Sequence, residues 1–380
     1  MKVTVNESIA NIGRDAWNAL AGSNYPFLRH EFLHAAETRG SGSADAGWTP
    51  RHLTLHDHDD QLRAALLLYE KSHSWGEFVF DWAWARAYEQ AGLPYYPKLV
   101  SAVPFTPAPS KRLLLADPDD VDAATAMVDG AITLAAETGC SSFHILFPEP
   151  GELDLLRETG LHIRKDCQFH WHNDNYDSFD DFLATFSSAK RKKARRDRRR
   201  VAEAGIRFRR LSGNELCNEI WDIVYRLISI TFMRRGSLPY FSQQFFNEIS
   251  RALPESILVV LAEKEGMAIA AAVYFVGDDT LYGRYWGSDG HYDALHFETC
   301  YHQGIEYCIE NDLRLFEPGT QGEHKISRGF IPEETWSAHW LKQPEFFSAI
   351  GDYLDHERRH VERYMDAVDA HSPYKNKDSS

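Results

Sequence analysis

The sequence predicts an α/β fold made of two similar halves, and three observations support this prediction. A chain of 380 residues with 43% hydrophobic content can bury a full core and is long enough for two domains. Leu53–Tyr69 aligns without gaps on Val259–Phe275, and each segment reads as strand, acidic turn and strand. Segments of helical spacing follow both hairpins, so we expect strands and helices to mix within each half.

The first half continues after its hairpin with further strands and helices. The aromatic run Phe78–Trp82 predicts another strand, Ala83–Ala91 has helical spacing, and Lys98–Val103 is a further strand candidate. Three more elements follow: an Ala-rich amphipathic helix at Val121–Thr138, a buried strand at Phe143–Phe147 and a strand at Leu161–His172. We therefore assign residues 1–172 to the first half.

A long helix is predicted to connect the halves. Ser178 can cap it, acidic residues in its first turn favour it, and Gly205 ends it, which gives a helix over Tyr176–Ala204. After the second hairpin come a strand at Leu281–Trp286, a helix at Leu295–Glu310 and a strand at Arg314–Glu317. We expect a basic connecting helix at 173–205 and a second half, with the candidate active site, at 206–380.

Composition excludes several classes of protein. The longest apolar run, Ala64–Tyr69, is far shorter than the roughly 20 residues that span a bilayer, and the first residues lack the hydrophobic core of a signal peptide. We therefore expect no transmembrane segment and a cytoplasmic location. The cysteines are odd in number and form no C-x-x-C pair, which argues against a disulfide framework and a zinc site, so no metal is predicted: Cys140, Cys167, Cys217, Cys300 and Cys308.

One segment is strongly basic in a chain whose net charge is -15. Lys190–Arg200 holds nine basic residues and one acid, Asp197, within eleven positions. Such a block attracts a polyanion, for example a tRNA, a nucleotide diphosphate or an anionic lipid surface. The alternative is a solvated helix face with no ligand. The candidate anion-binding residues are Lys190, Lys193, Arg195, Arg196 and Arg199.

A loop after the last predicted strand of the second half, Glu317–Phe330, has the composition of a reactive site. Glu323 or His324 can accept a proton, while Lys325 and Arg328 can bind a carboxylate or phosphate. Free backbone N–H groups near glycines can face a carbonyl oxygen that develops negative charge. The alternative is a solvated connection whose charges serve solubility. The glycines concerned are Gly319 and Gly322.

The helix before this loop carries a further candidate pair. Glu298 and His302 are four residues apart and therefore share one helix face, where they can form an acid–imidazole pair. A lone histidine on a helix is also commonly a packing or surface residue, so Glu298 is the catalytic candidate here and His302 ranks below Glu323 and His324.

The first half contains a second polar set among aromatic residues. The polar residues are His73, Glu77, Asp81 and Lys98, and the aromatic residues include Tyr96. The rings can form the core of the first sheet, or they can line a substrate groove and stack on a flat or sugar-like ligand. In the second case Asp81, Tyr96 and Lys98 bind the substrate. Burial within an aromatic strand would raise the pKa of Asp81.

Several motifs, in this order, resemble a known family over nearly the whole chain. They are Pro26-Phe-Leu28, His73-Ser-Trp-Gly-Glu77, Phe80-Asp-Trp82, Tyr95-Tyr-Pro-Lys98, Val103-Pro-Phe-Thr-Pro107, Tyr282-Gly-Arg-Tyr-Trp-Gly287, His296-Phe-Glu298 and the Glu317-Pro-Gly to Arg328-Gly-Phe330 loop. The chain resembles the FemAB-like N-acyltransferases, which are also labelled peptidoglycan biosynthesis or recognition proteins and are grouped with the GNAT superfamily.

The resemblance implies two fused GNAT-like halves, each with a mixed, mostly antiparallel sheet flanked by helices. It implies transfer of an acyl or aminoacyl group to an amine of a small molecule, a peptide or a cell-wall precursor, with acyl-CoA or aminoacyl-tRNA as donor. Lys190–Arg200 resembles the basic residues that hold tRNA or a nucleotide diphosphate in Fem-type relatives, and Arg284 falls in a motif expected to bind substrate.

One departure from the GNAT pattern leaves the acyl donor unassigned. The Q/R-x-x-G-x-G/A loop, whose N–H groups hold a diphosphate in GNAT enzymes, is missing, and Gly287-Ser-Asp-Gly290 is a loose substitute. The alternative function is a non-catalytic GNAT-like module that binds RNA or a nucleotide-linked precursor through its basic helix.

Overall fold

The computed structural model describes residues 2–40, 42–320 and 322–375, and the chain divides into two compact units. Unit 1 contains the chain up to Cys167 together with Glu334–Arg363, and unit 2 contains Gln168–Glu333 and the chain from Tyr364. The basic segment lies in unit 2. The chain passes between the units within three elements: β9 (His162–His172), β15 (Ile331–Leu341) and α12 (Pro344–Asp369).

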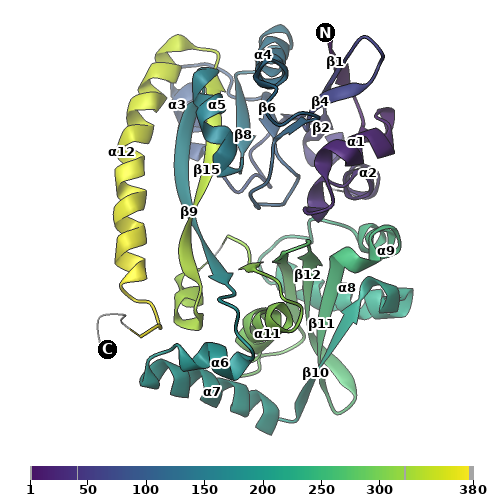
Figure 1. The fold of residues 1–380 in the computed structure, drawn as a ribbon, viewed down its shortest axis with the longest axis vertical. Coiled ribbons are helices and arrows are strands. Elements are labelled where there is room, and N and C mark those ends of the chain that lie inside the picture. Colours follow the sequence, from purple (N-terminus) through teal and green to yellow (C-terminus); the bar gives the residue numbers. More distant parts are fainter. Residues whose placement is uncertain (1, 41, 321, 376–380) are drawn as a thin grey trace. The chain divides into compact units, whose positions relative to one another are not determined.

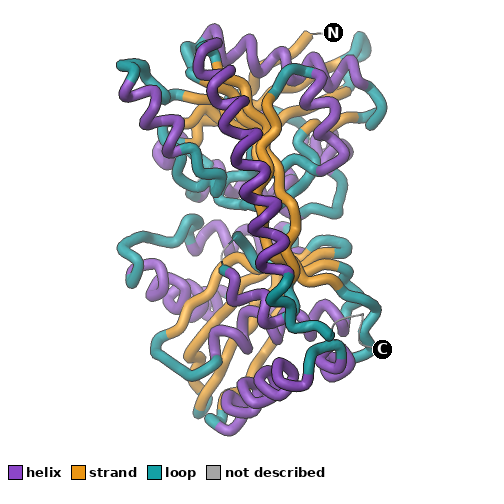
Figure 2. The backbone as a smooth tube through the Cα atoms, turned by 90° about the vertical axis from the view of Figure 1, so that its left-hand side faces the viewer, coloured by secondary structure: helices purple, strands orange, loops and turns teal. Residues whose placement is uncertain are grey.

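Unit 1 begins with a strand and two helices and continues with short strands (Figures 1 and 2). Besides the three elements that pass between the units, its strands and α-helices are β1 (Lys2–Asn6), α1 (Arg14–Ala21), α2 (His30–Arg39), β2 (Trp48–Pro50), β3 (His52–His56), β4 (Leu62–Leu66), β5 (Tyr69–Lys71), α3 (Trp82–Gln90), β6 (Lys98–Ser101), β7 (Leu113–Leu115), α4 (Val121–Glu137), β8 (Ser142–Leu146) and α5 (Leu153–Glu158).

The strands of unit 1 form two sets. One sheet has the order β1-β3-β4-β7, and the second set has the order β15-β8-β6-β5-β2. Helix α4 presents small residues such as Ala124 and Ala131 to the core, where Leu53, Leu66 and Phe143 are buried. Small side chains let the helix approach the strands closely, so α4 closes one face of this core.

The described strands of unit 2 form one set, flanked by helices. Its elements are α6 (Phe179–Ala184), α7 (Ser188–Glu203), β10 (Ile206–Ser212), α8 (Asn218–Met233), α9 (Gln243–Ala252), β11 (Ile257–Lys264), β12 (Met267–Val276), β13 (Thr280–Ser288), α10 (Leu295–Phe297), the π-helical turn η7 (Glu298–His302), α11 (Gln303–Glu310), β14 (Leu315–Glu317) and the 3₁₀ helix η8 (Glu323–Arg328). The strand order is β10-β11-β12-β13-β14-β9. Helix α8 packs so closely on β13 that a Cβ at Gly287 would lie 2.0 Å from the carbonyl oxygen of Leu227.

Both units share a hairpin and a parallel strand pair. The hairpins β3–β4 and β11–β12 are antiparallel, which confirms the two predicted hairpins. In unit 1 β6 pairs in parallel with β8 after the α4 crossover, and in unit 2 β13 pairs in parallel with β14 after α10–α11. The predicted fold class, α/β with mixed, mostly antiparallel sheets flanked by helices, is confirmed.

Two predicted elements are wrong. Phe78–Trp82 is not a strand: Phe78 has φ of 60° and Asp81 is the residue before α3, so the backbone turns away from any extended path. The long helix is broken between α6 and α7, because Phe186 bridges to Tyr374 and Ser187 donates its backbone N–H to Pro373. Among the described residues, no helix combines the length and the apolar character needed to cross a membrane.

Candidate active site

The loop after β14 lies where two parallel strands of unit 2 separate. β13 and β14 pair over Thr280–Tyr282 and Leu315–Glu317, and β14 then ends while β13 continues to Ser288. The chain turns at Gly319, whose φ is 88°, a value that favours glycine. It then forms η8, which carries the predicted residues Glu323 to Arg328. The loop is therefore held against the open edge of β13.

An ion pair and a buried lysine form the base of this loop. Arg284 donates from Nη1 and Nη2 to the two carboxylate oxygens of Glu317, each at 3.0 Å, and both side chains are nearly inaccessible. The Lys325 ammonium group, 1% exposed, donates to the carbonyl oxygen of Gly319. Burial lowers the pKa of Lys325 to about 7; Arg284 lowers it further and Glu317 opposes both. Lys325 is thus partly neutral near pH 7.

The His324 imidazole lies beside Lys325 and is hydrogen-bonded to a tyrosine. Its Nε2 is 2.8 Å from the hydroxyl group of Tyr301 on η7. Burial, with smaller effects from Arg328 and Lys325, lowers the pKa of His324 below its ordinary value. A neutral imidazole can accept a proton, so the ring has the protonation state that a base requires. Gly322, with φ of 104°, accommodates this ring, since a Cβ there would lie 2.1 Å from it.

The remaining predicted loop residues differ in their surroundings. Glu323 is exposed and accepts a hydrogen bond from the Tyr364 hydroxyl group at 3.1 Å. The Arg328 guanidinium lies 3.3 Å from the centroid of the Phe297 ring and donates to the carbonyl oxygen of His324. The structure therefore brings together the predicted residues Arg284, Gly319, Gly322, His324, Lys325 and Arg328, whereas the Glu323 side chain contacts Tyr364 of α12.

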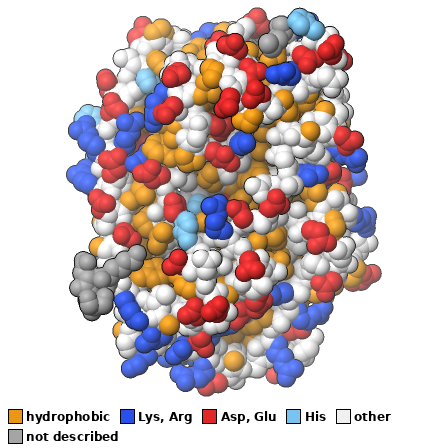
Figure 3. Space-filling view, viewed as in Figure 1, with side chains coloured by type: hydrophobic (Ala, Val, Ile, Leu, Met, Phe, Trp, Pro, Cys, Tyr) orange, Lys and Arg blue, Asp and Glu red, His pale blue; other side chains and the backbone are white. Residues whose placement is uncertain are grey.

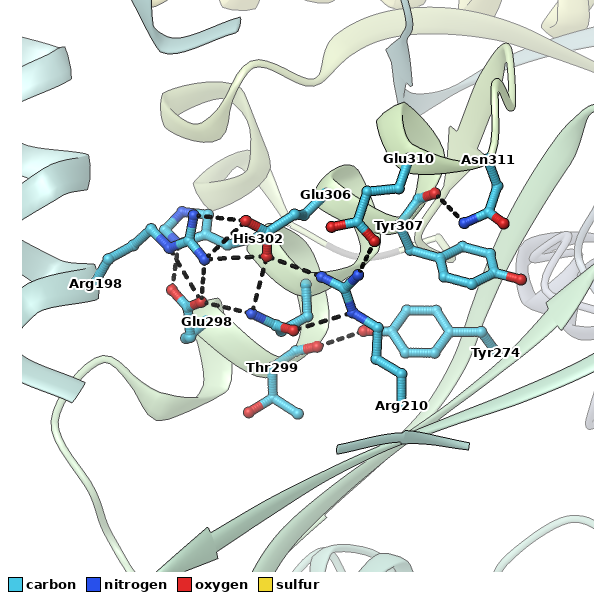
Figure 4. A network of polar contacts seen from close by, with 11 residues as sticks. Arg198, Arg210, Tyr274, Glu298, Thr299, His302, Glu306, Tyr307, Glu310 and Asn311 are labelled. Carbon is cyan, nitrogen blue, oxygen red and sulfur yellow. Dashed lines mark hydrogen bonds and ion pairs between the residues drawn. The ribbon is translucent and has the colours of Figure 1, made fainter. Parts of the chain in front are cut away.

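Glu298 is the centre of a buried ionic network (Figure 4). It accepts hydrogen bonds from His302 Nδ1 at 2.9 Å and Gln303 Nε2 at 3.0 Å, so the predicted pair with His302 is present. Arg198 of α7 donates to Glu298 at 3.2 Å and to Glu306 of α11. Burial opposes ionisation of Glu298, but His302, Arg198 and Gln303 prevail and lower its pKa to about 2. Glu298 is therefore ionised at neutral pH and already hydrogen-bonded to His302, Gln303 and Arg198.

We expect Glu298→Ala to lower the free energy of unfolding by roughly 2–3 kcal/mol, less than for a fully buried pair because Arg198 is partly exposed. The folded pKa lies below the ordinary 4.5, so this contribution is complete above about pH 4.5 and disappears as pH falls towards 2. Urea unfolding at pH 7 and pH 3 tests this. The loss should shrink at pH 3, and an equal loss at both values would contradict it.

The basic helix α7 uses its cations in two ways. Arg198 on its inner side joins the network, Arg195 pairs with Asp180 at 2.9 Å, and Arg200 pairs with Asp293 at 2.9 Å. Three exposed residues make no ion pair with any other described residue: Lys192, Lys193 and Arg199. Basic side chains gather at the lower edge of the space-filling view, where α7 lies (Figure 3). Of the predicted anion-binding residues, Lys190 is half-buried and Arg196 lies 3.8 Å from Asp197.

The predicted polar set of unit 1 forms a second buried cluster. Lys98 Nζ donates to Glu77 at 2.7 Å, to Ser74 at 2.9 Å and to Asp81, and all four side chains are buried. The prediction of a raised pKa for Asp81 is wrong. Burial raises this pKa, but Lys98, His144 and Tyr95 together outweigh burial and lower it to about 2. Tyr96 reaches the same cluster, because its hydroxyl group is 2.8 Å from Ser74 Oγ.

Several residues of these sites were not predicted. Tyr301 and Arg198 meet the site from other elements. Tyr95 belongs to the predicted aromatic set, but its hydrogen bond to Asp81, at 2.6 Å, was not predicted. The rings of His144 and His339, 195 positions apart, are joined by a 2.9 Å contact between their Nδ1 atoms. Tyr301 was within reach of the sequence, since it follows Glu298 by three residues and so lies near it on the helix. The other contacts join distant segments that carry no local signal.

Comparisons with known proteins agree with this architecture. The chain matches the FemAB-like family, described as peptidoglycan biosynthesis/recognition, over residues 8–376. Similar solved structures are FemX (13% identity, 92% of this chain and 100% of that chain, TM-score 0.56) and L-PGS from Bacillus licheniformis (11% identity, 90% and 95%, TM-score 0.53). At these identities the structures show the fold alone. No curated protein matches the chain. Because the family match spans nearly the whole chain, the protein belongs to the FemAB-like family.

Proposed function

We propose that the protein is an N-acyltransferase that moves an acyl or aminoacyl group onto an amine acceptor. The observation that carries this proposal is the pairing of two nitrogen bases with lowered pKa values, Lys325 and His324, in one loop beside Tyr301 and the Arg284–Glu317 pair. Acyl transfer to nitrogen needs a neutral amine nucleophile, a proton acceptor and donors for an oxyanion. The acceptor brings the amine, and the loop supplies groups for the other two tasks.

The proposed reaction forms one C–N bond and breaks the ester or thioester bond of the donor. The acceptor nitrogen attacks the carbonyl carbon and loses a proton to His324 or to neutral Lys325, and that proton then reaches the departing oxygen or sulfur. Glu323 is the alternative base, and Arg328 and the N–H groups near Gly319 and Gly322 can stabilise negative charge on the carbonyl oxygen. We assign Glu298 a positioning role, because its carboxylate already holds His302 and Arg198.

The surroundings of the helix that follows β13 favour aminoacyl-tRNA over acyl-CoA as donor. In the loop before α10, Gly290 donates its N–H to Ser288 Oγ at 3.4 Å and Leu295 donates to Tyr292 at 3.3 Å. Asp289 and Asp293 add negative charge beside these amides. A diphosphate would meet occupied N–H groups and two acids there. The exposed cations of α7 instead suit the phosphates of an RNA.

The acceptor is proposed from the family alone. The FemAB-like family carries the description peptidoglycan biosynthesis/recognition, and FemX is among the similar structures. We therefore propose an amine of a peptide or cell-wall precursor as acceptor, with a nucleotide-linked precursor as one form of it. A non-catalytic module that only binds RNA would share the α7 surface but would transfer no acyl group.

Binding of uncharged tRNA at several salt concentrations tests the donor assignment. In a variant with Lys192, Lys193 and Arg199 replaced by Gln, the slope of log affinity against log salt should fall by about one for each lost phosphate contact. The matched control replaces Lys111, Arg359 and Arg363, three exposed cations of unit 1, and should behave as the wild type. Equal losses in both variants, or tight acetyl-CoA binding without tRNA binding, would contradict the assignment.

A further inference from the structure

The last described residues of the chain return to the break between α6 and α7 (Figure 1). Tyr374 forms an isolated antiparallel bridge with Phe186. Two backbone hydrogen bonds flank this bridge, from the Ser187 N–H to the Pro373 carbonyl oxygen at 2.9 Å and from the Lys375 N–H to the Thr185 carbonyl oxygen at 3.0 Å. Residues 373–375 are therefore attached to the chain just before α7, and we call them the C-terminal strap.

The side chain of Tyr374 extends from the strap to the candidate loop. Its hydroxyl group donates to the carbonyl oxygen of Gly329, the residue that follows η8, at 2.7 Å. Burial raises the pKa of Tyr374 well above its ordinary value, and Tyr176 and Asp174 raise it further. The hydroxyl group therefore stays protonated and can donate at neutral pH. One side chain thus joins the break between α6 and α7 to the end of the loop.

This contact is closely packed. The rings of Tyr374 and Phe186 pack edge to face with centroids 5.4 Å apart, and Phe186, which is fully buried, packs in the same way on Phe182 at 5.0 Å. A Cβ at Gly329, where φ is 91°, would lie 2.9 Å from the Tyr374 hydroxyl oxygen and 2.7 Å from the Phe182 ring. Only a glycine lets the strap and α6 approach the loop this closely.

The turn that Tyr374 holds also positions two of the proposed functional residues. Gly329 directly follows Arg328, and its N–H donates to the carbonyl oxygen of Ile326 at 3.0 Å. The N–H of Phe330 donates to the carbonyl oxygen of Lys325 at 3.4 Å. Because these bonds link the end of η8 to its first residues, a fixed Gly329 carbonyl group restrains the backbone that carries Lys325 and Arg328.

Helix α7 acts on the same loop through charge. Burial lowers the pKa of Arg328 to about 10, while Tyr301 and Asp197 of α7 oppose this shift. Asp197 is the one acid within the basic block Lys190–Arg200, and its side chain is only 17% exposed. The inner side of α7 is therefore close enough to influence the loop, and the strap contacts the chain at the start of this helix.

We propose that the C-terminal strap fixes the candidate loop relative to α7, with Tyr374 as the positioning residue for Lys325 and Arg328. This inference rests on the proposed function, in which α7 binds the phosphates of an RNA and the loop transfers a proton. A base must be held within hydrogen-bond reach of the proton that it accepts, and a small misplacement costs much of the rate. The strap restrains the loop relative to the helix that would hold the donor.

Hydrogen–deuterium exchange of the purified protein, without any substrate, tests the strap itself. Tyr374→Phe keeps the ring and removes the hydroxyl group, so the amides of residues 323–330 should exchange faster by about tenfold, as expected for one lost hydrogen bond. The amides of residues 185–195 should exchange as in the wild type. Tyr374→Ala also removes the ring that packs on Phe186, so exchange should become faster in both segments.

Transfer kinetics test the positioning role. Tyr374→Phe should lower kcat by about tenfold and leave KM for aminoacyl-tRNA unchanged, because the loop loses its restraint while α7 keeps its contacts. Tyr374→Ala should also raise KM. The matched control is Tyr225→Ala, a half-buried tyrosine of α8 in the same unit that packs on Phe246. It should leave kcat and the exchange of residues 323–330 as in the wild type.

The possible outcomes separate this inference from the proposed function. Unchanged exchange of residues 323–330 in folded Tyr374→Ala, or an equal change in Tyr225→Ala, would overturn the strap. Wild-type kcat in Tyr374→Phe would overturn the positioning role. Faster exchange in the Tyr374 variants, together with no amide product from the wild type, would support the strap and count against the proposed acyl transfer alone.

Discussion

Replacing Lys325 by Met is expected to lower kcat for acyl transfer by roughly 10²–10⁴-fold, the range for loss of a proton-transferring group. Burial makes Lys325 a base that is partly neutral near pH 7. Its folded pKa lies far below the ordinary 10.5, so folding disfavours its charged form below pH 10.5, and Met should leave the unfolding midpoint unchanged or raise it. Activity and stability should therefore change independently.

The wild-type rate should rise as pH increases through about 7, where Lys325 loses its proton, and Lys325→Met should lose this dependence. Lys264→Met, a lysine at the end of β11 in the same unit, is the matched control and should keep full activity. Glu323→Gln and His324→Ala in the same assay show which neighbouring group shares the proton. Lys325→Met with wild-type kcat would refute the assignment.

Replacing Lys98 by Met is expected to lower the free energy of unfolding by roughly 3–5 kcal/mol, because Glu77 and Asp81 would be left as buried acids without a counter-ion. Lys71→Met is the matched comparison, since Lys71 is equally buried but has no ion pair among the described residues. Burial lowers its pKa to about 7, so folding disfavours the charged form and Met should cost little or stabilise. Urea unfolding at pH 7 measures the free energy of unfolding of the wild type, Lys98→Met and Lys71→Met.

The pH dependence gives an independent check of the Lys98 cluster. The folded pKa of Asp81, about 2, lies below its ordinary 3.8, so its contribution is complete above about pH 4 and disappears as pH falls towards 2. The difference between wild type and Lys98→Met should therefore shrink in acid. Equal destabilisation by Lys98→Met and Lys71→Met would show that volume, and not charge pairing, determines the loss.

Local patterns predicted the parts of the fold that local physics determines. The two hairpins follow from apolar strands around acidic tips, where Asp60 and Glu265 have φ of 59° and 52°. The break between α6 and α7 could not be predicted, because it depends on contacts of Phe186 and Ser187 with residues near 373. The aromatic spacing of Phe78–Trp82 resembles a strand, but Phe78 and Phe80 lie on a loop and Trp82 begins α3, and Phe80 and Trp82 are exposed.

The sequence could indicate which residues belong to the candidate site, but not how their pKa values are shifted. Residue types identified the loop from Gly319 to Arg328, and helical spacing identified Glu298 with His302. The burial that lowers the pKa of Lys325, and the Lys98 contact that lowers the pKa of Asp81, arise from tertiary packing. Likewise, Arg198 meets Glu298 across 100 positions of sequence, which turns part of a predicted anion site into internal structure.

The most direct test is a transfer assay with the purified protein, labelled aminoacyl-tRNA, labelled acetyl-CoA and an amine-bearing peptidoglycan precursor peptide. We predict that wild-type protein forms an amide product from aminoacyl-tRNA, that acetyl-CoA gives little product, and that Lys325→Met gives none above background. Binding of tRNA without amide formation under all conditions, by protein that is folded, would contradict the proposed acyltransferase and support a non-catalytic RNA-binding module.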